Sequence, residues 1–129
     1  MKTKLIHKKE SFFGSKKMSL ILIFVLEVML VFTFLDFFLH SLSSAYAVPS
    51  RYFGNEVIFG TIFGFFIYIL VKNKKIFQKS LIFSAIMAAA IQLIYLSIGY
   101  PLSFILTFFV INFIIMFVVS YLGLKIAKM

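Results

Sequence analysis

The sequence predicts an all-α integral membrane protein: a four-helix bundle, N-in/C-in, with both chain ends in the cytoplasm. Three observations carry this prediction. Of the 129 residues, 63% are hydrophobic and the mean hydropathy is +1.10, whereas an average soluble domain is about 45–50% apolar. The apolar residues gather into four runs, each long enough to cross a hydrocarbon core of about 30 Å. Basic residues flank these runs, and the length leaves room for one compact unit.

The first predicted span covers residues 18–40 and follows a basic cytoplasmic tail, residues 1–17. The Ala45-Tyr46-Ala47 tripeptide has the small-x-small form of a signal-peptide cleavage site. However, the apolar run before it has about 22 residues, against 7–15 for a signal peptide. Glu27 and Asp36 also interrupt that run. We therefore expect a retained helix with two acidic groups at membrane depth.

The second predicted span covers residues 54–71 and follows a connection, residues 41–53, that contains Pro49. Its first residues, Gly54 and Asn55, can cap a helix, which places Glu56 in the first turn, where a negative charge suits the helix dipole. A G-x-x-x-G pair within the span lets another backbone approach closely. The two glycines of this predicted packing face are Gly60 and Gly64.

The third and fourth predicted spans cover residues 80–98 and 101–124, and a short cytoplasmic tail, residues 125–129, ends the chain. The turn between these spans is Gly99-Tyr100-Pro101, and proline suits the first turn of a helix. The third span carries small residues that favour tight helix packing. The alanines among them are Ala85, Ala88 and Ala89.

Charge predicts the orientation and the partners. Six lysines lie in the amino tail, four in residues 72–79 and two after residue 124, whereas Arg51 alone lies on the other side. The positive-inside rule therefore places both termini in the cytoplasm, and we expect the plasma membrane as the location. Because the net charge of +9 is distributed around apolar runs, it indicates contact with lipid headgroups and excludes nucleic acid as the expected partner.

Polar residues predict two layers within the bundle. Glu27, Gln92 and Asn112 each lie ten to thirteen residues from a basic helix end, so we expect them to meet near the middle of the membrane. Such a layer can be a structural clasp that holds the helices together, or a proton- or cation-binding site, because intramembrane carboxyl groups often mark ion paths.

The second predicted layer lies near the outer surface. Asp36 and His40 are four residues apart and share a helix face, and an antiparallel pairing of the first two helices brings Glu56 level with them. These three residues can form an ion-pair and capping network with Arg51. Alternatively, they can bind a divalent metal through nitrogen and oxygen ligands. The cofactor is otherwise unknown.

Two partial resemblances to known families both fail on defining residues. Asp36-x-x-x-His40 is similar to the opening of a copper-ligand pattern in the C subunit of membrane methane and ammonia monooxygenases. That pattern needs a second histidine where this chain has Phe53. A carboxyl group in the first of four helices also resembles small multidrug-resistance transporters, but their Trp- and Gly-rich signature is absent.

The sequence favours a non-enzymatic membrane protein, because it has no P-loop, G-x-S-x-G, H-E-x-x-H or dinucleotide-binding motif. We expect an accessory or assembly subunit, or a homo-oligomer, with other membrane subunits or further copies of the chain as partners. The alternatives are a small ion- or proton-coupled transporter or channel using Glu27, and a membrane metal-binding protein using Asp36, His40 and Glu56.

Overall fold

The computed structural model describes residues 16–129, and within that range the chain is helical with no strand. The predicted tail, residues 1–17, lies almost wholly outside the described residues. A short 3-10 turn, η2, covers Ser44–Tyr46. The long helices are α2 (Lys17–His40), α3 (Arg51–Val71), α4 (Ile76–Ile98) and α5 (Leu102–Ala127).

The four long helices of residues 16–129 are each long and apolar enough to cross a membrane. In lipid, backbone N–H and C=O groups must be paired inside the segment, and a helix does this completely. The prediction of four helices that are long and apolar enough to span a membrane is confirmed. The chain therefore has the architecture of a small multi-pass membrane protein.

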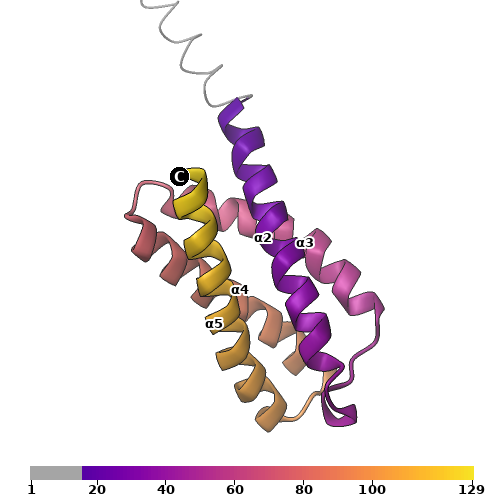
Figure 1. Ribbon diagram of the computed structural model, residues 1–129. Helices are drawn as coiled ribbons and strands as arrows, with labels where there is room; N and C mark the ends of the chain where they lie inside the picture. Colours follow the sequence, from indigo (N-terminus) through magenta and orange to yellow (C-terminus); the bar gives the residue numbers. More distant parts are fainter. Residues whose placement is uncertain (1–15) are drawn as a thin grey trace, which may run out of the picture.

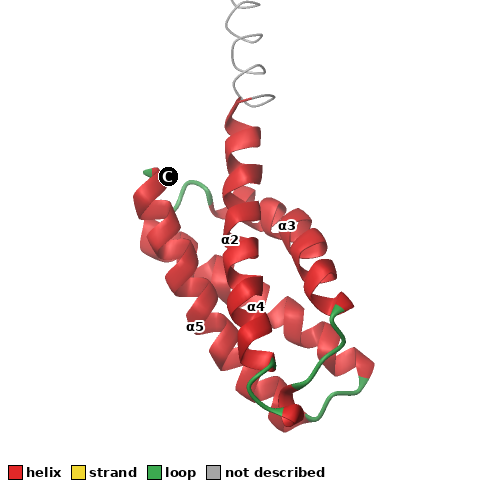
Figure 2. Cartoon of the chain, turned by 45° about the vertical axis from the view of Figure 1, so that its right-hand side comes forward, coloured by secondary structure: helices red, strands yellow, loops and turns green. Residues whose placement is uncertain are grey.

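The helices pack in a ring. Helix α2 contacts α3 and α5, and α4 contacts the same two helices from the other side. In Figure 1, α2 and α5 lie in front and α4 lies behind them. Figure 2 shows that all connections between the helices lie at the two ends of the bundle. Each helix therefore turns one face toward the common core and another face outward.

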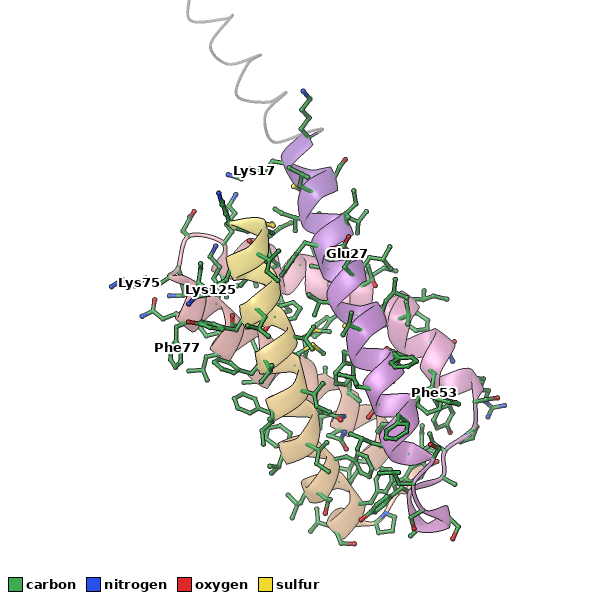
Figure 3. The ribbon with its side chains drawn as sticks, viewed as in Figure 1. Lys17, Glu27, Phe53, Lys75, Phe77 and Lys125 are labelled. Carbon is green, nitrogen blue, oxygen red and sulfur yellow. The ribbon has the colours of Figure 1, made fainter. Side chains whose placement is uncertain are left out.

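The two ends of the bundle differ in charge. Lys17, Lys75 and Lys125 lie at one end, which we call the basic end, and Phe53 lies toward the other (Figure 3). The opposite end, which we call the loop end, carries the α2–α3 connection and the α4–α5 turn. At the basic end, the buried ammonium group of Lys79 donates a hydrogen bond to the carbonyl oxygen of Met129. This bond ties α4 to the end of the chain.

Three helices extend further than the apolar runs. Helix α3 begins at Arg51, so Asn55 and Glu56 lie inside the helix and do not form its cap and first turn as expected. The reason is Pro49, whose carbonyl oxygen accepts the Tyr52 N–H at 3.0 Å and starts the first turn earlier. Helix α4 begins at Ile76 and α5 continues to Ala127, because a helix continues beyond the hydrocarbon into polar surroundings, where hydropathy gives no signal.

The core contains large apolar side chains from all four helices. Phe32 and Met29 of α2 are fully buried, as is Met116 of α5. Phe83 and Met87 of α4 lie in the same cluster. Most of the remaining apolar side chains point outward, as expected where lipid surrounds the protein.

Small residues set how closely the helices approach. Gly64 lies against Val25 of α2 and Phe83 of α4, and Gly60 lies against Met29. Ala88 is fully buried, whereas Ala85 and Ala89 are half-buried. The contact between α4 and α5 also includes the Ser84 and Ser120 hydroxyl oxygens, which are 3.4 Å apart. Small side chains thus lie at three helix contacts.

Gly64→Ala should destabilise the bundle. An added Cβ would lie 2.9 Å from Val25 Cγ1 and 3.3 Å from the Phe83 ring, and such overpacking typically costs about 1–3 kcal/mol. Gly54→Ala is the matched control, because a Cβ there meets nothing within 4 Å and alanine favours the helix by about 0.5–1 kcal/mol. Reversible unfolding in mixed micelles measures both. Equal stability of the two variants would contradict the close α2–α3 contact.

Candidate functional site

Buried ionisable side chains gather near the loop end of the bundle. Asp36 and His40 lie one turn apart on α2 and are 0% and 3% exposed. Glu56 comes from the second turn of α3, which packs against this part of α2. We call Asp36, His40 and Glu56 the acid–histidine cluster. The packing of α2 against α3 brings Glu56 close enough to Asp36 for the two carboxyl groups to interact.

The contacts of His40 define which nitrogen of the imidazole ring carries a hydrogen. Its Nδ1 atom lies 2.6 Å from the carbonyl oxygen of Tyr46 in η2. Because a carbonyl oxygen only accepts, Nδ1 must carry the hydrogen. The other ring nitrogen, Nε2, lies 3.4 Å from Asp36 Oδ1. A neutral imidazole then offers only a lone pair to Asp36, so a hydrogen bond between the two side chains needs one further shared proton.

Glu56 adds a second carboxyl group to the same place. It interacts electrostatically with Asp36, and both of its oxygens are buried without a hydrogen-bond partner among residues 16–129. Two adjacent negative charges are unfavourable in an apolar interior. The cluster is therefore chemically suited to take up a proton or another cation.

Aromatic rings enclose the imidazole. The Phe108 ring stacks on His40 with a centroid separation of 4.2 Å and an interplanar angle of 8°. The Tyr46 ring makes a T-shaped contact with the Phe108 ring, with 5.2 Å between the ring centroids. Further rings within about 6 Å of His40 belong to Phe53, Phe104 and Tyr95.

Tyr100 lies in the α4–α5 turn. Burial, together with the neighbouring Tyr52 hydroxyl, raises the pKa of Tyr100, so this phenol stays neutral.

The predicted metal ligands were Asp36, His40 and Glu56. Among residues 16–129, no group of three or more His, Cys, Asp or Glu side chains is arranged to hold a metal ion. His40 already uses one nitrogen for Tyr46, and its other nitrogen faces Asp36. Metal binding by Asp36, His40 and Glu56 stays a prediction.

Arg51 does not join the cluster. Among residues 16–129 it forms no ion pair with Asp36 or Glu56, and the close contact of Asp36 is with the His40 imidazole. Its side chain is exposed, and its guanidinium carbon lies 5.7 Å from the centre of the Tyr52 ring. The expected network of Asp36, His40, Arg51 and Glu56 therefore does not include Arg51.

The three residues of the predicted mid-membrane layer do not share one environment. Gln92 and Asn112 are buried, 3% and 0% exposed, and their amide groups have no hydrogen-bond partner in residues 16–129. Glu27 is exposed on the outside of α2 and does not meet them. The reason is helix geometry: Glu27 lies nine residues before Asp36, which is about half a revolution around the helix. Turning Asp36 inward therefore turns Glu27 outward.

Glu27 lies in the middle of an uncovered apolar surface, about half-way along α2 (Figure 3). It makes no hydrogen bond or ion pair with the described residues. Its neighbours at helical spacing are large and exposed, and Phe34 has 72% of its surface uncovered. We call this surface the Glu27 face; its residues are Ile23, Glu27, Leu30, Val31 and Phe34.

Sequence reasoning missed the enclosure of His40. Phe104 and Phe108 lie four residues apart on α5 and share a face with Asn112, which is buried. That spacing was a usable signal for a ring pair facing the bundle. However, the chain has 19 phenylalanines, and the pattern alone does not say which of them face His40.

Comparison with known proteins identifies no relative. No family model, curated protein or solved structure matches the chain.

Asp36 and His40 should be energetically coupled. In a double-mutant cycle of Asp36→Asn and His40→Gln, we expect a coupling free energy of unfolding of at least about 0.5 kcal/mol, because the two side chains touch. Glu27→Gln combined with His40→Gln is the control, and those effects should add within about 0.5 kcal/mol. Reversible unfolding in micelles gives all the values. Simple additivity for Asp36 with His40 would show that the two groups do not act as a pair.

Proposed function

We propose that the chain is a non-enzymatic subunit of a membrane assembly, and that the assembly consists of copies of this chain joined through the Glu27 face. The observation that carries this proposal is the exposure of Glu27 in the middle of a membrane-spanning helix. A charged carboxyl group facing lipid there costs at least about 2.5–3.5 kcal/mol. A partner that covers the face and accepts or donates a hydrogen bond removes that cost.

A second copy is the partner that this face fits best. Copies inserted in the same orientation hold Glu27 at the same depth, so two parallel α2 helices bring the two carboxyl groups together. A protonated carboxyl group donates a hydrogen bond and an ionised one accepts it, which makes the pair self-complementary. Polar side chains paired in this way join helices within membranes. Ile23, Val31 and Phe34 then supply the surrounding apolar contact.

The acid–histidine cluster supports a second candidate, proton- or cation-coupled transport. Its two carboxyl groups and imidazole are enclosed and short of hydrogen-bond partners, and buried ionisable groups in membranes often lie on ion paths. The predicted route needs Glu27, Gln92 and Asn112 to lie together, but Glu27 faces outward whereas the other two are buried. A liposome flux assay separates the routes: Asp36→Asn should abolish flux and Glu27→Gln should leave it intact.

Cross-linking between copies tests the homo-oligomer. The chain has no cysteine, so a single introduced cysteine reports one position. Val31→Cys should give a disulfide-linked dimer in vesicles, because Val31 belongs to the Glu27 face. Val110→Cys on α5 should not, although Val110 is also about half exposed and lies at a comparable distance from the loop end. Equal cross-linking at both positions would contradict a specific α2 interface.

The carboxyl group itself needs a separate variant. Glu27→Leu should reduce the dimer fraction, since leucine fills the face but cannot pair through a hydrogen bond, and Glu27→Gln should retain most of it. The dimer fraction is measured by equilibrium dilution in lipid vesicles. A monomeric wild-type chain, or a Glu27→Leu variant that dimerises equally well, would overturn the proposed interface.

The orientation remains part of this proposal. Twelve of the 13 basic residues lie in segments at the basic end or in the amino tail, so the positive-inside rule assigns that end to the cytoplasm, in the plasma membrane. An impermeant thiol reagent added to intact cells should label Arg51→Cys and should label Lys74→Cys only after permeabilisation. The opposite pattern would invert the assignment.

A further inference from the structure

A groove between α3 and α4 opens on the outside of the bundle. It has a volume of about 560 Å³ and its wall is almost entirely apolar. Glu56 contributes to the wall, but its carboxyl oxygens are buried, so the groove offers hydrocarbon contact along its length. Its lining residues include Phe63, Met87, Ala90 and Ile98.

The groove is long enough to span one leaflet of a membrane. On α3 it runs from Tyr52 to Phe63, a rise of eleven residue steps, or about 16.5 Å at 1.5 Å per residue. Half of a hydrocarbon core about 30 Å thick is about 15 Å. It therefore begins at headgroup level near the loop end and ends near the middle of the membrane. This length matches one acyl chain of a bilayer lipid.

The mouth of the groove carries hydrogen-bond donors. Tyr52 and Asn55 line it at the loop end. The Arg51 guanidinium group lies beside the Tyr52 ring, with its central carbon 5.7 Å from the ring centre, and the Arg51 side chain is exposed. A guanidinium group binds a phosphate through charge-assisted hydrogen bonds. The positive charge of Arg51 therefore favours a lipid headgroup that contains a negatively charged phosphate.

We propose that the α3–α4 groove binds one glycerophospholipid from the leaflet at the loop end, with an acyl chain in the groove and its phosphate on Arg51. The occupant is a phospholipid and not a soluble phosphate, because the apolar wall is the larger part of the site. A cationic amphiphile is disfavoured at this mouth by the positive charge of Arg51. This site is separate from the Glu27 face, so its test does not depend on oligomerisation.

Native mass spectrometry of the full chain in detergent tests the proposal by titration with dioleoylphosphatidylglycerol. Arg51→Ala should weaken binding about tenfold, the loss of one charge-assisted contact. Lys74→Ala, which removes the same charge at the basic end, should bind like the wild type. Ala90→Phe should fill the groove and weaken binding by at least about tenfold. Ile114→Phe, on the exposed face of α5, is its control.

Two comparison ligands separate the contribution of the acyl chains to binding from that of the headgroup. Dioleoylglycerol, which lacks the phosphate, should bind about tenfold more weakly than the phospholipid and be insensitive to Arg51→Ala. Glycerol phosphate, which lacks the acyl chains, should not bind measurably. Helical content by circular dichroism confirms that each variant is folded.

Three results would overturn the proposal. The first is phospholipid affinity unchanged by both Arg51→Ala and Ala90→Phe. The second is equal affinity for dioleoylglycerol and the phospholipid, which would make the mouth irrelevant. The third is loss of a dimer in Ala90→Phe with lipid binding retained, which would make the groove a contact between protein chains.

Discussion

Hydrocarbon satisfies no hydrogen-bonding group, and this constraint governs the whole molecule. It requires the backbone to form complete helices wherever the chain crosses lipid, and residues 16–129 contain four such helices. It also requires ionisable side chains to turn toward one another. Asp36, His40 and Glu56 do so near the loop end, enclosed by aromatic rings. Glu27 does not, and it is therefore the informative exception.

The rotation of α2 links these two observations. One helix cannot direct both Asp36 and Glu27 into the same bundle, because about half a revolution separates them. The buried stripe of α2, which includes Val25, Phe32 and Asp36, selects the side that faces inward. An outward Glu27 is then a consequence of the core packing. A partner outside the bundle is a physical way to satisfy it, and a second copy is the simplest such partner.

Much of the fold was predictable from the sequence and part of the site was not. Hydropathy located the four helices because the length of a consecutive apolar segment is enough to predict a helix that can span a membrane. It misplaced the start of α3, because the turn at Pro49 forms in a polar segment. The Asp36–His40 spacing predicted a shared face correctly. Depth counting grouped Glu27 with Gln92 and Asn112, because depth does not record the direction in which a side chain points.

The sequence pattern could not predict that side chains distant in the sequence enclose His40. Phe108 stacks on His40 across the bundle, and the Tyr46 carbonyl that binds His40 belongs to a 3-10 turn in a segment read as a loop. The α3–α4 groove likewise depends on how two helices that are adjacent in the chain pack against each other. Such features follow from tertiary packing, which local periodicity does not encode.

The rotation of α2 is the central claim, and a disulfide within one chain measures it directly. The chain has no native cysteine, and a Cβ at Gly64 lies 2.9 Å from Val25 Cγ1. Val25→Cys combined with Gly64→Cys should therefore form an intramolecular disulfide on mild oxidation. Glu27→Cys combined with Gly64→Cys should form no disulfide within one chain. An intramolecular cross-link through residue 27 but not through residue 25 would place Glu27 inside the bundle and contradict the account.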